Sequence, residues 1–162
     1  MAELGPTTLE GMQLRLEPLR PDHADGLLRA GAAPEIWPWM SAALMSAAAV
    51  ATFIDSAMRA AAHGQEYAFA VVLKESGRMV GSTRYMDVQA ASRGVEIGWT
   101  WYAPDVWATT INPECKFLLL QHAFETWGAL RVQLKTDIKN TRSQAAIRKL
   151  GAQYEGTLRN HR

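Results

Sequence analysis

The sequence predicts one α+β (α/β) domain, residues 1–162, built around a single sheet. Its length of 162 residues is that of one typical domain. Hydrophobic residues make up 48% of the chain and charged residues 20%, which is the composition of a globular protein with a full core. Segments with strand periodicity and segments with helix periodicity follow one another without a linker or an internal repeat. A sheet with helices packed on it accommodates this order.

Charge and cysteine content argue against several classes of protein. The net charge of +1 gives no broad field for nucleic acid or an anionic membrane, so we expect neither as a partner. The single cysteine, Cys115, cannot form an internal disulfide, and the histidines show no ligand spacing, so no metal is expected. The N-terminal segment lacks the pattern of a secretory signal, and there is no apolar window of about 18 residues. We therefore expect a cytoplasmic protein with Cys115 in its core.

The first third of the chain predicts a strand and a helix. Residues Leu9–Leu19 alternate in polarity, with Met12, Leu14 and Leu16 on one face, as in a strand. Asp22 is a suitable N-cap for the helix that follows. The apolar residues of this helix are Ala24, Leu27, Leu28 and Ala30.

An aromatic loop and a second helix come next. Residues 31–41 are irregular, and the tryptophans Trp37 and Trp39 either line a substrate pocket or anchor the loop on the core. Ser46 is the expected N-cap of a helix that runs to Ala62 and stops at Gly64.

Three antiparallel strands are expected after this helix. The runs 67–74 and 79–88 are rich in β-formers and are joined by a turn sequence, which indicates a hairpin. Residues 95–102 form the third strand. Gly98 within it marks a bulge or a place where another group approaches the backbone closely.

A longer helix is predicted after the third strand. Asn112 is its expected N-cap, Pro113 occupies the first helical position, and Gly128 provides a left-handed C-cap. A loop that leads into a helix start carries free N–H groups and is a candidate anion site, although an ordinary capped helix explains the same residues. The apolar positions of this helix are Phe117, Leu118, Leu120, Phe124 and Trp127.

The chain then continues with a strand and a short helix. Residues 131–136 alternate in polarity as a strand does. Asn140 precedes a helix over residues 141–150, which Gly151 can end.

In order and motif, the chain resembles the GNAT superfamily of acyl-CoA-dependent N-acetyltransferases, and within it the RimJ/RimL-type branch. The resemblance covers nearly the whole chain. It implies a mixed, mostly antiparallel twisted sheet with helices on both faces and splayed central strands. Acetyl-CoA would bind in the splay and donate its acetyl group to a primary amine, on a protein N-terminus or a small molecule, by direct attack. The motifs that carry the resemblance are Val95-Glu96-Ile97-Gly98-Trp99, Asn112-Pro113-Glu114-Cys115-Lys116, and Asn140-Thr141-Arg142-Ser143 leading to Lys149-Leu150-Gly151-Ala152.

The resemblance assigns the cofactor contacts. The family's glycine-rich pyrophosphate loop falls on residues 107–112, where Trp107, Thr110 and Asn112 replace the usual residues. We expect side chains to supply the donors that close backbone approach normally supplies. Asn140 matches the residue that binds the pantetheine region, and a helix N-cap is its alternative role. Further contacts are expected from Trp101, Tyr102, Thr109, Ile111 and Ser143, and from one of Lys139, Arg142, Arg148 and Lys149 to the 3′-phosphate.

The catalytic groups are assigned in the same way. Glu96 is the candidate base, unless it only pairs with Arg84 or Arg93 on the sheet. A main-chain N–H within residues 98–102 would stabilise the oxyanion. Ile147 occupies the place of the usual tyrosine acid, so Ser143 is the candidate acid, with local capping as its alternative. Tyr85 and Tyr102 are less specific candidates for the acid.

The acceptor and the C-terminal edge are less defined. Contacts with the acceptor are expected from Trp37, Trp39, Tyr85 and Trp99. Relatives add a final strand after one that corresponds to Tyr154–Arg159, so we expect either a shortened chain or a homodimer that supplies the missing edge. The alternative function is a non-catalytic acyl-CoA-binding or regulatory module, which the absent glycines and tyrosine favour.

Overall fold

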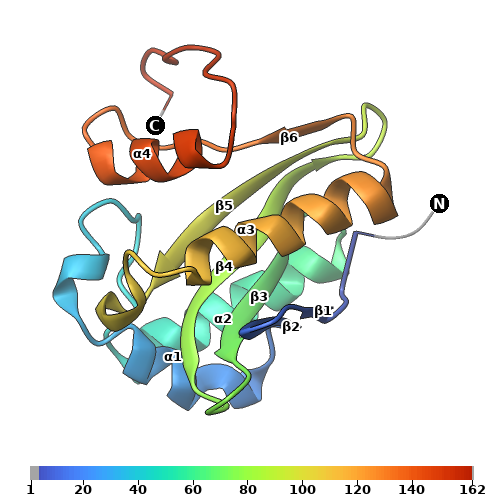
Figure 1. Ribbon diagram of the computed structural model, residues 1–162. Helices are drawn as coiled ribbons and strands as arrows, with labels where there is room; N and C mark the ends of the chain where they lie inside the picture. The colour runs from blue at the N-terminus through green and yellow to red at the C-terminus, as the bar shows by residue number, and fades with distance from the viewer. Residues whose placement is uncertain (1–3, 162) are drawn as a thin grey trace.

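The computed structural model describes residues 4–161 and contains a six-stranded sheet with the strand order β1-β2-β3-β4-β5-β6 (Figure 1). All neighbouring strands are antiparallel except β5 and β6, which run parallel. The predicted mixed, mostly antiparallel sheet is therefore confirmed. The strands are β1 (Leu9–Glu10), β2 (Leu14–Pro18), β3 (Tyr67–Leu73), β4 (Met79–Gln89), β5 (Gly94–Tyr102) and β6 (Arg131–Gln133).

Helices cover both faces of the sheet, as expected. On one face lies α3 (Ile111–Gln121), which continues as the π-helical segment η4 (His122–Trp127). On the other face lie α1 (Ala24–Ala30) and α2 (Ala47–Ala62), while α4 (Thr141–Lys149) follows β6 (Figure 1). Short 3-10 turns are η1 (Pro21–His23), η2 (Pro34–Ile36) and η3 (Pro104–Val106).

Each face of the sheet has its own apolar core. The cluster beneath α3 includes Leu14 and Cys115, both fully buried, which confirms the core position of the cysteine. The cluster beneath α1 and α2 includes Phe53, and it also includes Trp37 packed on Trp101 with ring centroids 5.0 Å apart. Burial of these side chains supplies the main force that holds the helices on the sheet.

The N-terminal strand differs from the expectation. Residues 9–19 form a hairpin in which β1 pairs with β2, and Leu9 lies opposite Leu16. Met12 is therefore in the turn and 91% exposed, whereas Leu14 and Leu16 are fully buried. The predicted face was wrong for Met12, because the chain reverses direction at Gly11 to Gln13. Asp22 also lies inside η1, where Arg20 is the N-cap.

The middle of the chain agrees with the expectation. Ser46 caps α2 by accepting a hydrogen bond from the Ala49 amide, and Gly64 follows the helix with φ 67°. The hairpin of β3 and β4 and the third strand β5 are present at the expected positions. These elements depend on local patterns, which is why sequence alone predicts them well.

The C-terminal third contains both confirmed and wrong boundaries. Gly128 ends the π-helical segment with φ 80°, and Gly151 follows α4 with φ 81°, as predicted. The N-cap of α3 is Thr110, so the prediction for Asn112 was wrong. Strand β6 has only 3 residues, shorter than the run 131–136. Within the described residues, 154–159 form no strand and are exposed.

Candidate functional site

The divergence of β5 from β6 is the main irregularity of the sheet. The parallel pairing joins Gly94 with Arg131, Val95 with Val132 and Glu96 with Gln133, and it goes no further. Beyond Glu96, β5 continues along β4 while the chain after β6 turns away toward α4 (Figure 1). One edge of β5 from Ile97 to Tyr102 therefore has no partner strand within the described part of the chain.

A bulge lies in β5 at this divergence. The ladder with β4 pairs Arg84 with Gly98 and Ser82 with Trp101, so Trp99 and Thr100 are left out of the register. Trp99 has φ 49°, a left-handed conformation that costs a non-glycine residue on the order of 1 kcal/mol. The irregularity predicted from Gly98 is thus present at the next residue. The two residues of the bulge, Trp99 and Thr100, therefore lie opposite the single residue Thr83, where the other edge of β5 has no partner strand within the described residues.

Gly98 itself is needed for close packing. A Cβ atom added there would meet Met86 Sδ at 2.6 Å and Glu96 Oε1 at 3.3 Å. The first of these contacts would force the Met86 side chain to move, and the second is tight. The glycine therefore lets the Glu96 carboxylate lie against the strand beside the bulge.

Glu96 is the one carboxylate among the buried polar residues of the described chain, and it is 3% exposed. Its Oε2 forms an ion pair with Lys135 Nζ at 2.7 Å and accepts a hydrogen bond from Gln133 Nε2 at 3.4 Å. The alternative prediction that Glu96 pairs with Arg84 or Arg93 was wrong. Glu96 does form an ion pair, but with Lys135, which follows β6. Arg84 pairs with Glu66 instead.

The loop before α3 exposes several main-chain donors. Thr109 Oγ1 donates to the Val106 carbonyl and accepts from the Ile111 amide, so this hydroxyl is occupied locally. Ala108 has φ 58°, the left-handed region that glycine usually occupies. Within residues 4–161, no recorded hydrogen bond uses the amides of Ala108, Thr109, Thr110 and Asn112. They lie at the positive end of the α3 dipole, which suits an anion.

The side chains of this loop point in several directions. The Thr110 hydroxyl exchanges hydrogen bonds with the Gln13 side chain, at 2.8 and 3.2 Å. Asn112 Oδ1 accepts from the Tyr102 hydroxyl at 3.0 Å. Ile111 is buried in the core beneath α3. These three side chains are engaged within the protein, so the loop offers main-chain donors more readily than the expected side-chain donors.

Trp107 connects the two sides of the divergence. Its Nε1 donates to the Tyr102 carbonyl at 2.9 Å, at the unpaired edge of β5. The guanidinium of Arg142, in the first turn of α4, lies 3.9 Å from the Trp107 ring centroid. A cation over an aromatic face is attracted by about 0.5–1 kcal/mol at an exposed site. The resemblance implies Gln or Arg at the position of Trp107, and α4 brings the guanidinium of Arg142 to it.

The candidate tyrosines are held in the core. The Tyr85 hydroxyl donates to the Leu119 carbonyl, and burial raises its pKa. Burial also raises the pKa of Tyr102 well above its ordinary value. Neither hydroxyl faces the bulge, so only the main chain of Tyr102 borders the divergence. Trp101 is likewise buried on the opposite face, where its Nε1 has no partner within the described residues.

Helix α4 carries Asn140 and Ser143 at its start. Asn140 is the N-cap, and its Oδ1 accepts from the Ser143 amide at 3.1 Å. The capping alternative is therefore confirmed, and the Asn140 Nδ2 donor has no recorded bond within residues 4–161. The Ser143 hydroxyl also has no recorded bond in this part of the chain. Ile147, at the position where the resemblance implies a tyrosine, is half-buried.

Lys116 is a buried cation that was not predicted as a site residue. It is 5% exposed on α3, and its Nζ donates to Thr100 Oγ1 at 2.6 Å beside the bulge. Thr100 Oγ1 in turn lies 2.8 Å from Thr83 Oγ1. No ion pair to Lys116 exists among residues 4–161, and burial lowers its pKa to about 8. No sequence pattern marks Lys116, because its burial depends on how α3 packs over β5.

The expected acceptor contacts separate into two groups. Trp99 lines a cleft of about 500 Å³ on the α2 face, together with Phe53 and Arg84. Trp37 is buried with its Nε1 donating to the Gly31 carbonyl, and Trp39 is 46% exposed outside this cleft. Tyr85 lies on the α3 face. Of the four, only Trp99 reaches the cleft.

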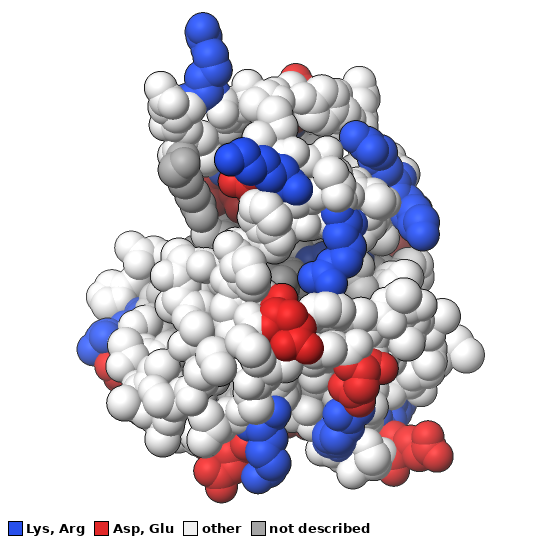
Figure 2. All heavy atoms as spheres, turned by 90° about the vertical axis from the view of Figure 1, so that its left-hand side faces the viewer, with Lys and Arg blue, Asp and Glu red and all other residues white. Residues whose placement is uncertain are grey.

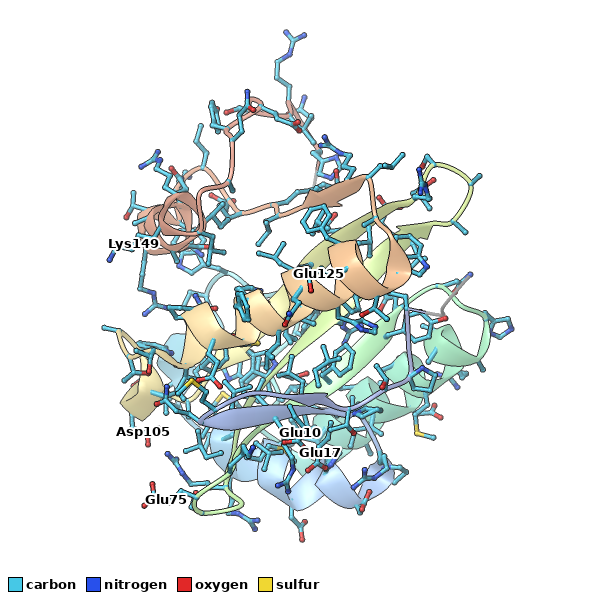
Figure 3. The ribbon with its side chains drawn as sticks, turned by 45° about the vertical axis from the view of Figure 1, so that its right-hand side comes forward. Glu10, Glu17, Glu75, Asp105, Glu125 and Lys149 are labelled. Carbon is cyan, nitrogen blue, oxygen red and sulfur yellow. The ribbon has the colours of Figure 1, made fainter. Side chains whose placement is uncertain are left out.

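Basic side chains border the divergence. Figure 2 shows a hollow between the C-terminal part and the rest of the molecule, with Lys and Arg gathered around it and Asp and Glu mostly below. Arg148 and Lys149 lie in the last turn of α4, and Figure 3 shows Lys149 on the outer side of that helix. Asp105 and Glu75 lie at the opposite end (Figure 3). Of the basic residues of α4, Arg142 has a defined contact, with the Trp107 ring.

The described residues contain neither a metal-binding cluster nor a membrane-spanning helix. No group of His, Cys, Asp and Glu in residues 4–161 could hold a metal ion. No helix in that part is long and apolar enough to cross a membrane.

Comparison with known proteins identifies the family. Residues 13–153 match the family described as "Acetyltransferase (GNAT) domain". An uncharacterized N-acetyltransferase p20 of Bacillus licheniformis is 23% identical over 155 residues, covering 95% of this chain and 86% of that protein.

Solved structures agree. A GCN5-related N-acetyltransferase from Brucella melitensis has TM-score 0.90 and 26% identity, covering 98% of this chain and 72% of that one. RimJ of Mycobacterium smegmatis, solved in complex with CoA-disulfide, has TM-score 0.86 and 22% identity, covering 99% and 82%. The splayed sheet and the family match over 13–153 agree, and the chain belongs to the GNAT acetyltransferase family.

Proposed function

We propose that this protein is an N-acetyltransferase that uses acetyl-CoA to acetylate a primary amine, on a protein N-terminus or a small molecule. The observation that carries the proposal is the grouping of three features along one divergence of strands. These are the buried carboxylate of Glu96, the bulge at Trp99 and the unpaired amides of the loop before α3. Each corresponds to a need of the reaction.

The residues present fit acetyl-CoA. The amides of Ala108, Thr109, Thr110 and Asn112 lie at a helix start and suit a pyrophosphate. The left-handed backbone of Ala108 supplies the turn that glycine supplies in relatives. Arg142 and Asn140 Nδ2 add a cation and a donor from α4. These contacts support binding by a loop that contains no glycine.

Acetyl-CoA supplies the acetyl group as a thioester, so that an N–C bond forms as the C–S bond breaks and the proton lost by the amine is balanced by one gained by the thiol. Glu96 is placed to accept the amine proton, directly or through water. A main-chain N–H at the bulge of Trp99 and Thr100 is the proposed donor to the developing negative charge. Ser143 and Lys116, the latter through Thr100, are the groups that can hold a proton or positive charge beside the departing sulfur.

The overall likeness in fold to the RimJ of Mycobacterium smegmatis supports a RimJ/RimL-like position within the family. Such a position favours a protein N-terminus as acceptor. A small amine remains the alternative acceptor, because the cleft of about 500 Å³ beside Trp99 is large enough for one.

Titration calorimetry with acetyl-CoA, followed by an assay for CoA release with a panel of amines, tests the proposal. We expect saturable binding and amine-dependent release of CoA. An absence of heat and of any thermal shift with acetyl-CoA would reject the proposal, since a ligand that binds the native state must stabilise it.

A second candidate function is a non-catalytic acyl-CoA-binding module. The observation in its favour is the ion pair of Glu96 with Lys135, together with Ile147 at the usual place of the acid. The Lys135 ammonium occupies the carboxylate oxygen Oε2, which is therefore not free to contact an amine. Binding of acetyl-CoA without CoA release for any amine in the panel would support this candidate instead.

A further inference from the structure

The cleft beside Trp99 has mostly apolar walls and one buried cation. Small and apolar residues of α2 and the loop before it line the cleft, including Leu44 and Phe53, and Arg84 on β4 lines it as well. Arg84 is 7% exposed. Its guanidinium lies 4.9 Å from the Phe53 ring centroid and 5.3 Å from that of Trp99. The two rings also contact each other, with centroids 5.7 Å apart, so the guanidinium packs against the pair of rings and has lost most of its hydration.

Arg84 is only partly satisfied by the protein. Its Nη1 donates to Glu66 Oε2. Its Nε is buried and has no partner among the described residues, and no recorded bond in residues 4–161 uses Nη2. A buried donor without an acceptor costs about 1–3 kcal/mol, and more when it is charged. The pair Nε and Nη2 is one of the forks through which arginine binds a carboxylate with two parallel hydrogen bonds.

Arg84 also lies near the proposed centre of the reaction. It pairs across the ladder with Gly98, the residue before the bulge. Glu96 Oε1 lies 3.3 Å from the position that a Gly98 Cβ would take, on the same face. Residues two apart on a strand are separated by about 7 Å, and directly paired residues by about 5 Å. A buried anion and a buried cation therefore lie on the same face of the sheet on either side of Gly98, with Arg84 at the wall of the cleft and Glu96 behind Gly98, outside the lining of the cleft.

This arrangement favours one class of acceptor. An amine directed at Glu96 would place a group a few bonds away near Arg84, and a carboxylate there would satisfy Nε and Nη2 together. A polyamine or another multiply charged cation would bring positive charge against Arg84, which is unfavourable in a site with few water molecules. The apolar walls at Leu44 and Phe53 suit the carbon portion of the same molecule.

We propose that the acceptor is a primary amine that carries a carboxylate within a few bonds, and that Arg84 binds this carboxylate through Nε and Nη2. The inference rests on the proposed acetyltransferase function and narrows it. The same chemistry is present in a free α-amino acid and at a peptide N-terminus that begins with an acidic residue.

Matched acceptor pairs test the inference in the CoA-release assay. One arm compares α-amino acids with their carboxamides, and the other compares peptide amides that begin with Asp with those that begin with Asn. In at least one arm we expect kcat/KM to favour the carboxylate by about tenfold or more, the ratio that corresponds to one charge-assisted hydrogen bond. The arm that shows the ratio identifies the source of the carboxylate.

Two variants assign the preference to Arg84. Arg84→Met should bring the ratio of kcat/KM between carboxylate and amide close to one. Glu66→Gln removes the competing carboxylate and should raise the ratio, so the inference remains testable if Arg84→Met fails to fold. Arg29→Met on α1, outside this cleft, is the matched control and should leave the ratio unchanged.

Two different outcomes separate the two proposals. CoA release with amides and carboxylates at equal kcat/KM, or a ratio that Glu66→Gln does not change, would overturn the inference and leave the acetyltransferase function intact. A lack of CoA release with every amine would reject the function itself.

Discussion

At the scale of single residues, the Glu96 carboxylate is held by a cation that sequence patterns did not reveal. Lys135 follows β6, and its Nζ lies 2.7 Å from Glu96 Oε2. A buried ion pair can serve structure alone, because removing either partner leaves an uncompensated charge. It can also orient a base at the end of the parallel pairing. The two roles predict different behaviour for the two partners.

Substitution of each partner separates structure from catalysis. Glu96→Gln should lower kcat by on the order of 100-fold or more, the usual contribution of a general base, while the Kd of acetyl-CoA changes little. Lys135→Gln frees the carboxylate and should keep or raise kcat. Steady-state kinetics and calorimetry measure both quantities. Equal losses of kcat in the two variants, in proportion to lost stability, would assign the pair a structural role only.

Lys116 gives a prediction about stability and pH. Burial lowers the pKa of Lys116 from its ordinary value of 10.5 to about 8 in the native state. Between these values the unfolded chain binds more protons than the native one, so the contribution of Lys116 to the free energy of unfolding rises with pH. Below pH 8 both states are protonated and the full cost of burial remains.

Lys116→Met removes this dependence. The free energy of unfolding of the unsubstituted protein should rise relative to that of Lys116→Met as pH increases from about 8 toward 10, by at most about 3 kcal/mol. The variant should also be the more stable protein at pH 7. Urea unfolding of both proteins across this range measures the difference. A difference that stays constant with pH would show that Lys116 has an ordinary pKa.

Local sequence signals did not reveal these two lysines, for a physical reason. Lys116 contacts Thr100 on another element, and Lys135 contacts Glu96 across the end of the β5–β6 pairing. Periodicity identifies which face of an element is apolar, but it does not identify which distant polar atom a side chain reaches. The resemblance placed Glu96 correctly on the splayed strand because that placement depends on strand order.

At the scale of elements, most predictions from local signals were accurate. The apolar face predicted for the helix of α3 and η4 was wrong at Phe117 and Phe124, whose side chains are exposed. The periodicity of α2 and of β3 to β5 predicted these elements, and Asn140 and Gly128 gave true caps. Helix α3 begins before its apparent cap, because the loop enters the helix at Thr110 and Asn112 bonds to Tyr102 instead. Strand β6 is short because its pairing with β5 stops at Glu96 and Gln133, and a local sequence pattern does not predict where pairing stops.

Asn140 lets the cap of α4 be tested separately from cofactor binding. Its Oδ1 caps the helix, and its Nδ2 is the donor proposed for the cofactor. Asn140→Ala removes both the cap and the donor. It should destabilise the protein by about 1 kcal/mol and also lower its affinity for acetyl-CoA. Asn140→Asp keeps the cap and removes the donor, so stability should be retained while affinity falls. Thermal unfolding and calorimetry on both variants check this, and unchanged affinity in Asn140→Asp would confine Asn140 to capping.

At the scale of the whole molecule, the sheet consists of a well-covered body and a less covered end. The body, β2 to β5, has apolar cores on both faces. The end, from β6 to residue 161, contacts the body through three ladder pairs, through Gln133 and Lys135 at Glu96, and through Arg142 at Trp107. Val132 and Leu134 also pack on the core beneath α3. A ligand in the divergence would touch both parts and link them further.

Arg142 is therefore expected to couple binding to the joining of the two parts. Arg142→Gln removes the cation stacked on Trp107 and a charge that can bind the phosphates. It should lower the affinity for acetyl-CoA by about tenfold and make that affinity less dependent on salt. Lys149→Gln on the outer side of α4 is the matched control and should change affinity little (Figure 3).

Trp107→Leu keeps an apolar side chain but removes the ring. If the stacking orients Arg142, the effects of Trp107→Leu and Arg142→Gln on affinity should be less than additive in a double-mutant cycle, whereas full additivity would mean that Arg142 acts without Trp107.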